Sequence, residues 1–244
     1  MKSISRARSL AHLTTALMAL LLSASMSFAQ SKTSFEGHIR MDLKMEAGDG
    51  MDESMLDAMP IPKGIDYYVK GDKSKVVMAS KATGTQEILS IPDKAGKTQT
   101  YRLDAVNKVA QRMVMEAAKQ GAADKSKVVK TTQTKVINGY TCTLYKCEMQ
   151  EPNSGMNIKQ DIWATTEIDF KRPSMGVNEA WSEKIQGFPL QIDMDMMIVK
   201  LTMQVSKVDK VAQPEAMFMI PKGYKIEDLD TKKALPTKRL QQED

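Results

Sequence analysis

The stretch Phe35-Glu36-Gly37-His38-Ile39-Arg40-Met41-Asp42-Leu43-Lys44-Met45 decides the fold class of this chain. Every second position is apolar or glycine, and the positions between them are polar or charged. A strand points successive side chains to opposite faces, so a period of two predicts a strand with one apolar and one polar face. Strands of this kind are typical of an antiparallel sheet with one solvated side.

The same alternation recurs along the chain, with turn residues between its segments. Further strands are predicted at 65–69, 75–79, 86–91, 98–103, 108–113, 127–137, 140–149, 158–164, 188–192 and 199–205. Asn138-Gly139 predicts a two-residue hairpin turn, because both residues accept the positive φ that such a turn requires. The last two strands are out of phase, which predicts a turn or bulge between Asp193 and Ile198.

Three short segments have helical spacing instead. They contain Met51, Met55 and Met59; Val114–Gln120; and Val177, Trp181 and Ile185. No helix of crossover length alternates with the strands, which disfavours a parallel α/β sheet. We therefore expect a mainly β fold, with about ten or eleven strands in one large antiparallel sheet and two or three short helices.

Residues 1–29 have the layout of a cleaved export signal. A basic start precedes the apolar run Ala16–Leu22, and small residues lead to a cut between Ala29 and Gln30. This run is far shorter than the ~20 residues that span a bilayer. Gln30 also stands where a lipoprotein needs its lipidated cysteine. The sequence thus predicts a soluble periplasmic or secreted protein of a Gram-negative bacterium.

The chain divides into three predicted parts. They are the cleaved signal peptide 1–29, a single β domain over 30–230 and a charged flexible tail over 231–244. Removing the signal deletes three basic residues and no acidic one, so the formal charge falls from +5 to +2. The remaining basic residues are interleaved with acidic ones and lack accompanying aromatic residues. This pattern does not favour a nucleic-acid partner.

Few residues are available for catalysis. His38 is the only histidine after the signal, and it lies on the polar face of the first predicted strand. The chain has no Gly-x-Ser-x-Gly segment to supply a nucleophile, and too few His and Cys ligands for a zinc enzyme. We expect His38 to be a surface residue and the protein not to be an enzyme, with no catalytic residue, cofactor or metal site of this kind.

Cys142 and Cys147 lie five positions apart in one predicted strand. Their Cα atoms would then be roughly 16 Å apart, whereas a disulfide needs about 4.4–6.8 Å. Two unpaired, buried thiols are the favoured interpretation. A local disulfide that would overturn the strand prediction, and an intermolecular bridge, are the alternatives.

Methionine is unusually frequent, with 20 in the full sequence. Most occupy the apolar phase of a strand or helix, where methionine acts as an adaptable core residue. A methionine-lined groove would also fit acyl chains of varied shape. Thioether clusters such as Met194, Met196, Met197 and Met203 would alternatively suit Cu(I).

Five motifs together resemble a known family. They are Phe35–Met45, Tyr67–Lys73, Ile137–Cys142, Asp161–Thr165 and Met217–Tyr224. In order and spacing they resemble the bacterial family called domain of unknown function 4412, over roughly residues 34–226. That family is similar in predicted fold to the periplasmic lipoprotein carriers of the LolA/LolB-like superfamily. The resemblance implies a strongly curved antiparallel sheet, an unclosed half-barrel wrapped around small helices, whose concave face receives acyl chains in the carriers.

Carried onto this chain, the resemblance implies eight ligand-facing residues. Seven are apolar strand positions and the eighth would plug or cover the cavity from a helix: Ile39, Met41, Leu43, Leu190, Ile192, Leu201, Met203 and Trp181. The carriers' functional residues have no one-to-one match here, so lipoprotein transfer is not implied. We expect a non-enzymatic exported protein that binds a lipid or the acyl chain of a lipidated protein. The alternatives are a Met-rich Cu(I)-binding protein and an envelope-assembly module that docks another protein.

Overall fold

The computed structural model describes residues 34–48, 51–59, 61–81, 84–113, 126–150, 157–170, 184–196 and 199–228. The strands are β1 (Glu36–Ala47), β2 (Gly64–Lys70), β3 (Lys73–Ser80), β4 (Gly84–Pro92), β5 (Thr98–Asp104), β6 (Val109–Arg112), β7 (Lys127–Ile137), β8 (Tyr140–Gln150), β9 (Asn157–Thr165), β10 (Phe188–Asp195), β11 (Val199–Asp209) and β12 (Lys225–Asp228). Two short helices accompany them, α2 (Glu53–Ala58) and the single-turn 3-10 helix η4 (Glu215–Phe218).

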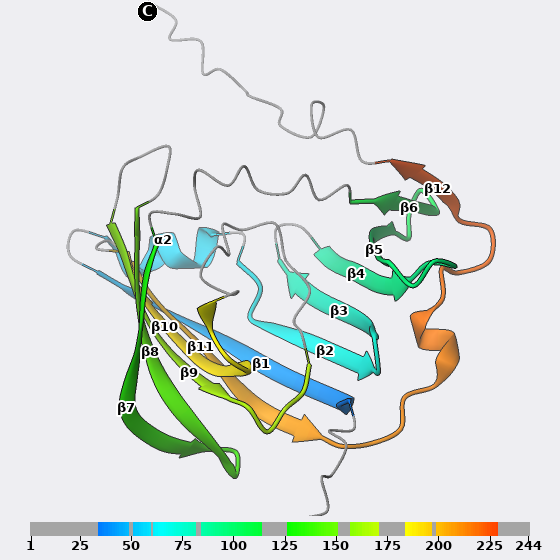
Figure 1. The fold of residues 1–244 in the computed structure, drawn as a ribbon. Helices are drawn as coiled ribbons and strands as arrows, with labels where there is room; N and C mark the ends of the chain where they lie inside the picture. The colour runs from blue at the N-terminus through cyan, green and yellow to red at the C-terminus, as the bar shows by residue number, and fades with distance from the viewer. Residues whose placement is uncertain are drawn as a thin grey trace, which may run out of the picture. The chain divides into compact units, whose positions relative to one another are not determined.

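All twelve strands belong to one sheet, in the order β12-β6-β5-β4-β3-β2-β1-β11-β10-β9-β8-β7. Figure 1 shows this sheet bending, with β7 and β8 standing steeply against β2 and β3. Its edges, β12 and β7, are not paired with each other in the described part of the chain. The prediction of a mainly β fold built on one large unclosed antiparallel sheet is confirmed.

The sheet differs from the prediction at its β12 edge. It has twelve strands instead of ten or eleven, and β12 runs parallel to β6 while every other neighbouring pair is antiparallel. The sequence does not reveal β12, because Lys-Ile-Glu-Asp contains a single apolar residue. A parallel neighbour requires a crossover connection, and the segment 210–224 supplies one. We call this segment the strap.

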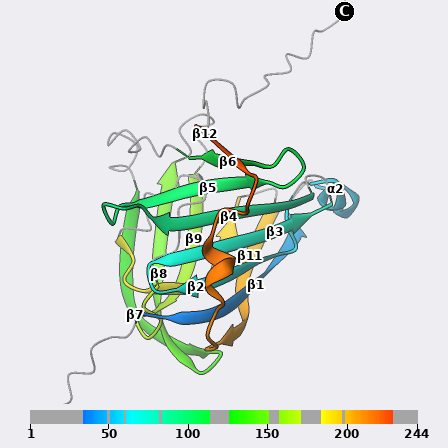
Figure 2. The same cartoon turned by 90° about the vertical axis from the view of Figure 1, so that its right-hand side faces the viewer.

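The strap gives the sheet a second core. We call the face that carries Ile39 and Met41 the inner face, and the opposite face the outer face. Figure 2 shows the strap crossing β2, β3 and β4. Its Phe218 is 2% exposed and packs with Leu89 and Tyr101 on the outer face. Leu89 follows the inner-face Ile88, so β4 is buried on both sides, which an alternating pattern alone does not predict.

Local signals in the sequence identified several connections correctly. Asn138 and Gly139 have φ of 50° and 82° and join β7 to β8, as predicted. Met196 N donates to Val199 O at 3.0 Å in the predicted turn between β10 and β11. The helix predicted around Met55 is α2, where the Asp52 carboxylate accepts a hydrogen bond from Ser54 N at 2.8 Å.

Other predictions fall outside the described residues. These are the signal peptide 1–29, the helix at 114–120, the residues 177–183 of the third predicted helix and the tail 231–244. The described strands all belong to one compact unit that begins at Ser34. Their arrangement defines a candidate site where β1 extends beyond β2.

Candidate functional site

Burial changes halfway along β1, although its alternation continues. On the inner face Ile39 and Met41 are 0% exposed, whereas Leu43 and Met45 are partly exposed. The reason lies in the neighbouring strand. β2 pairs with β1 only as far as Asp42, and one further hydrogen bond joins Leu43 N to Lys63 O. Beyond this point the register with β11 continues to Ala47, so β1 keeps a neighbour on one side.

This difference divides the inner face into two named halves. The closed half comprises Ile39, Met41, Tyr67, Phe188 and Leu190, each 0% exposed. The open half comprises Leu43, Met45, Leu201 and Met203, each partly exposed. The two halves share one sheet and one pattern of alternation.

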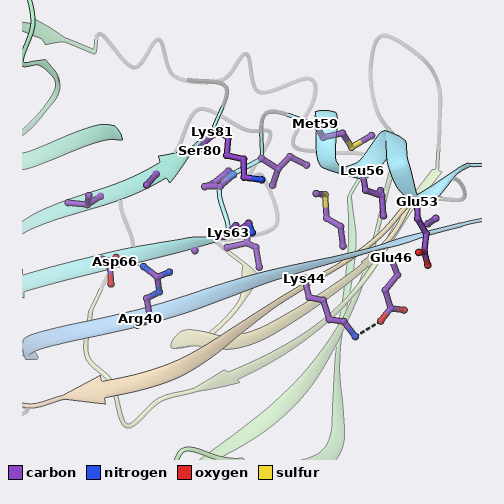
Figure 3. Close-up of a pocket in the computed structure, with 18 of the residues that line it drawn as sticks. Arg40, Lys44, Glu46, Glu53, Leu56, Met59, Lys63, Asp66, Ser80 and Lys81 are labelled. Atoms are coloured by element: carbon purple, nitrogen blue, oxygen red, sulfur yellow. Dashed lines mark hydrogen bonds and ion pairs between the residues drawn. The ribbon is translucent and has the colours of Figure 1, made fainter. Parts of the chain in front are cut away.

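A groove of about 1480 Å³ lies beside the open half, where β1 extends beyond β2 (Figure 3). Its apolar lining comes from the end of β1, from α2 and from the segment that leads into β2: Leu43, Met45, Ala47, Leu56, Met59, Ile61 and Pro62. Ligand pockets usually measure about 300–1,000 Å³, so this groove is large, and it is open on one side. The lining also includes charged residues, among them Lys44, Lys63 and Lys81.

Strand pairing extends the apolar surface from the groove across β11 and β10. Met45 pairs with Leu201 of β11, and Leu201 pairs with Met194 of β10. One step along, Leu43 pairs with Met203, and Met203 pairs with Ile192. Three methionines, Met45, Met194 and Met203, therefore surround Leu201 on the inner face. Unbranched thioether side chains can repack around different shapes.

The predicted ligand-facing residues divide between these environments. Ile39, Met41, Leu190 and Ile192 are 0% exposed and belong to the inner-face cores. Leu43, Leu201 and Met203 are partly exposed, and Leu43 also lines the groove. Trp181 lies outside the described residues. Their contact with a ligand stays a prediction.

Several groove residues were missed by the sequence reasoning. Leu56, Met59, Ile61 and Pro62 lie in a break in the alternation, between two strands. The helical spacing of Met51, Met55 and Met59 was the available signal, but of these three only Met59 lines the groove, and Met55 is exposed. The sequence does not show which strand that stripe faces.

His38 lies on the outer face, as predicted, but it is held in a charged cluster and is not a free surface residue. Its Nε2 is 2.8 Å from Asp66 Oδ1, its Nδ1 is 3.7 Å from Asp209 Oδ2, and its side chain is 19% exposed. The ring stacks on Tyr68 with centroids 4.7 Å apart. Hydrogen bonding, first to Lys207 and then to His38, lowers the pKa of Asp209. This cluster joins β1, β2 and β11, and its Asp66 also lines the groove.

The cysteines match the favoured interpretation. Cys142 and Cys147 are both free and buried, in β8. Loss of hydration on burial raises the pKa of each thiol to about 11. Each side chain is therefore a neutral thiol at physiological pH, and burial keeps it unreactive.

The described residues show neither a metal site nor a membrane-spanning helix. They contain no group of three or more His, Cys, Asp or Glu side chains placed to hold a metal ion. Within the same ranges, no helix has the length and apolar character needed to cross a membrane.

Three solved structures are distantly similar to this chain. PNGF-II is 12% identical, with 80% of this chain and 31% of that chain covered and a TM-score of 0.47. A DUF1329 family protein from Desulfovibrio piger is 11% identical, with 77% and 90% covered and a TM-score of 0.34. LprF from Mycobacterium bovis is 9% identical, with 73% and 88% covered and a TM-score of 0.32. This chain thus spans less than a third of PNGF-II, and likeness at this level carries no information on ligand or activity.

The family comparison is more specific. No curated protein matches the chain, but the domain of unknown function DUF4412 matches residues 35–224. That span begins just before β1 and ends at the last residue of the strap, so it takes in both cores, the groove and the crossover. The chain therefore belongs to the DUF4412 family.

Proposed function

We propose that this protein is exported and binds an apolar or amphiphilic ligand, a lipid or an acyl chain, without catalysing a reaction. The observation that carries the proposal is the contrast between Met41 and Met45. They lie on the same face of the same strand, yet Met41 is fully buried and Met45 is partly exposed beside an apolar groove. A soluble protein gains stability by covering such a surface, and a ligand would cover it.

Burial of apolar surface would supply the binding energy. Each methylene that leaves water contributes about 0.8 kcal/mol. A chain of about ten methylenes would gain roughly 8 kcal/mol before the costs of ordering the ligand and protein. This interaction needs no directional contact. It agrees with the aliphatic and thioether side chains in the lining of the groove, which also includes charged residues.

Export is the second part of the proposal, and residues 1–29 support it. The test uses protein expressed in full and recovered from the periplasm of a Gram-negative host. We expect the intact mass of a chain that begins at Gln30, together with a lipid-sized adduct in native mass spectrometry and lipid in a solvent extract. A bare polypeptide that yields no lipid would contradict the binding proposal, and uncleaved protein in the cytoplasm would contradict export.

Variants of the groove test the site itself. We expect the polyene fatty acid cis-parinarate to bind with a rise in fluorescence, and the Leu43→Asp/Leu56→Asp double variant to weaken binding at least about tenfold, or ~1.4 kcal/mol. The matched control is Val106→Asp/Val136→Asp, at positions 90% and 69% exposed and absent from the groove lining. Equal weakening in both double variants would contradict a binding site in the groove.

A second candidate function rests on the three methionines around Leu201. Met45, Met194 and Met203 would offer thioether ligands to Cu(I), which soft sulfur donors select. Anaerobic Cu(I) loading followed by a competing chelator tests this candidate. Stoichiometric, chelator-resistant copper that is lost when all three are changed to Leu would favour copper binding over lipid binding.

A further inference from the structure

The charged residues around the groove are unequally paired. Lys44 Nζ lies 2.7 Å from Glu46 Oε1, and Arg40 is bonded to both Asp42 and Asp66. Hydrogen bonds to these carboxylates, the one to Asp42 first, raise the pKa of Arg40. These groups therefore neutralise one another within the protein.

Lys63 and Lys81 are different. Both line the groove and are exposed, and neither forms an ion pair with any described residue. They also lie on neighbouring segments. The strands β2 and β3 are antiparallel neighbours, Lys63 directly precedes the first residue of β2, and Lys81 directly follows the last residue of β3. Figure 3 shows the two lysines together at one side of the pocket.

The acidic residue without an ion pair lies elsewhere in the groove. Glu53 begins α2 and is not paired with any described residue. In Figure 3 it stands near Glu46, below α2 and away from Lys63 and Lys81. The groove thus has a cationic end, at the junction of β2 and β3. Its apolar lining continues from there toward α2 and the end of β1.

We propose that the ligand is a single-chain anionic amphiphile, whose carboxylate or phosphate head is held between Lys63 and Lys81. Its chain lies along Leu43 and Met45 toward Met203. This inference rests on the proposed function and adds the ligand's head-group class and its orientation. The two ammonium groups, which have no ion pair among the described residues, match an anionic head, and they line the groove beside the apolar Ile61, Pro62 and Ala79. An ammonium binds phosphate or carboxylate as a compact point charge, without the fixed geometry that arginine imposes.

Three ligands of equal chain length separate the contribution of the head group to binding from the contribution of the chain. Dodecanoate, dodecyl phosphate and dodecanol are measured by displacement of the neutral fluorophore N-phenyl-1-naphthylamine at pH 8 and low salt. We expect the anionic ligands to bind at least about tenfold more tightly than dodecanol. Their advantage should shrink as salt is added, because screening weakens exposed charges. The anion that binds more tightly identifies the preferred head group, carboxylate or phosphate.

The Lys63→Gln/Lys81→Gln double variant tests the two residues. It is expected to abolish the preference for the anions while binding dodecanol as the wild type does. Lys94→Gln/Lys222→Gln is the matched control, since both residues are exposed, unpaired in the described part of the chain and outside the groove. It is expected to keep the preference.

The outcomes separate this inference from the proposed function. If all three ligands bind equally well, or both double variants lose the preference alike, the head-group assignment is wrong and the apolar site stands. If neither the fluorophore nor any ligand binds the wild type, both proposals are overturned.

Discussion

The closed and open halves of the inner face contain the same kinds of residues but are packed differently. Both alternate apolar residues on β1 with apolar partners across the sheet, and both contain a methionine of β1. In the closed half, β2 lies on one side of β1 and β11 on the other. In the open half β2 has ended, and a groove takes its place. Alternation therefore decides which face of the sheet a residue occupies. The neighbouring strands decide whether other residues pack against that face.

Aromatic packing completes the closed half. Tyr67 and Phe188 meet edge to face with ring centroids 6.0 Å apart, and Phe170 lies 5.6 Å from Phe188. Such geometry contributes about 0.5–1.5 kcal/mol per pair beyond the burial of area. In the open half the lining is aliphatic and thioether, which leaves it free to adapt.

The largest expected effect separates two methionines of one strand. Met41→Ala should cost about 2–5 kcal/mol of unfolding free energy, because it leaves a cavity in a fully packed core. Met45→Ala should cost less than about 1 kcal/mol, since its side chain is already partly in water, and it should weaken cis-parinarate binding. Urea denaturation measures both. Equal losses of stability would remove the distinction between the two halves.

Thiol chemistry gives the next test. Because burial raises the pKa of Cys142 and Cys147 to about 11, the native protein should resist N-ethylmaleimide at pH 8. In the unfolded chain the pKa of each of these thiols is ~8.5. Their contribution to stability is therefore complete below that pH and is lost as the pH rises toward 11.

Two variants sharpen the thiol test. The Cys142→Ala/Cys147→Ala double variant should lack this part of the alkaline loss of stability. In that background, Met45→Cys should be labelled rapidly at pH 8 and protected by bound dodecanoate, whereas Met41→Cys should not be labelled. Rapid labelling of the wild-type cysteines in the native state would show that the closed half opens readily.

The smallest effects are expected from charges on the outer face. Asp66 is bonded to both His38 and Arg40, and its side chain is 20% exposed. Asp66→Asn should cost about 1–2 kcal/mol, because it weakens two partly buried interactions. Glu46→Gln should leave the urea midpoint unchanged, because exposed ion pairs contribute little. A larger loss from Glu46→Gln than from Asp66→Asn would reverse the comparison.

Much of this architecture could be predicted from the sequence. Alternation located every strand from β1 to β11, and Asn138-Gly139 identified the β7–β8 hairpin because few residue pairs accept its backbone angles. Spacing in a strand also predicted that Cys142 and Cys147 do not form a disulfide with each other, and both are free. These are local properties, fixed by residues within a few positions of one another.

Other features depend on contacts between residues far apart in the chain. β12 has one apolar residue and forms because the strap delivers it to β6. Leu89 is buried on the outer face only because Phe218, from the strap, covers it. The groove arises because β1 continues past the start of β2. The sequence of one strand does not predict how far the neighbouring strand extends.

The sequence by itself determined the strands, their apolar faces and the tight turns, because backbone geometry and side-chain alternation are local. Only the tertiary structure decided that Met41 belongs to a sealed core and Met45 to an open groove, and that Lys63 and Lys81 both line this groove. The physical reason is that burial and charge pairing are properties of neighbours in space. A residue's sequence position sets the face it occupies, but the ends of the adjacent strands set what covers it.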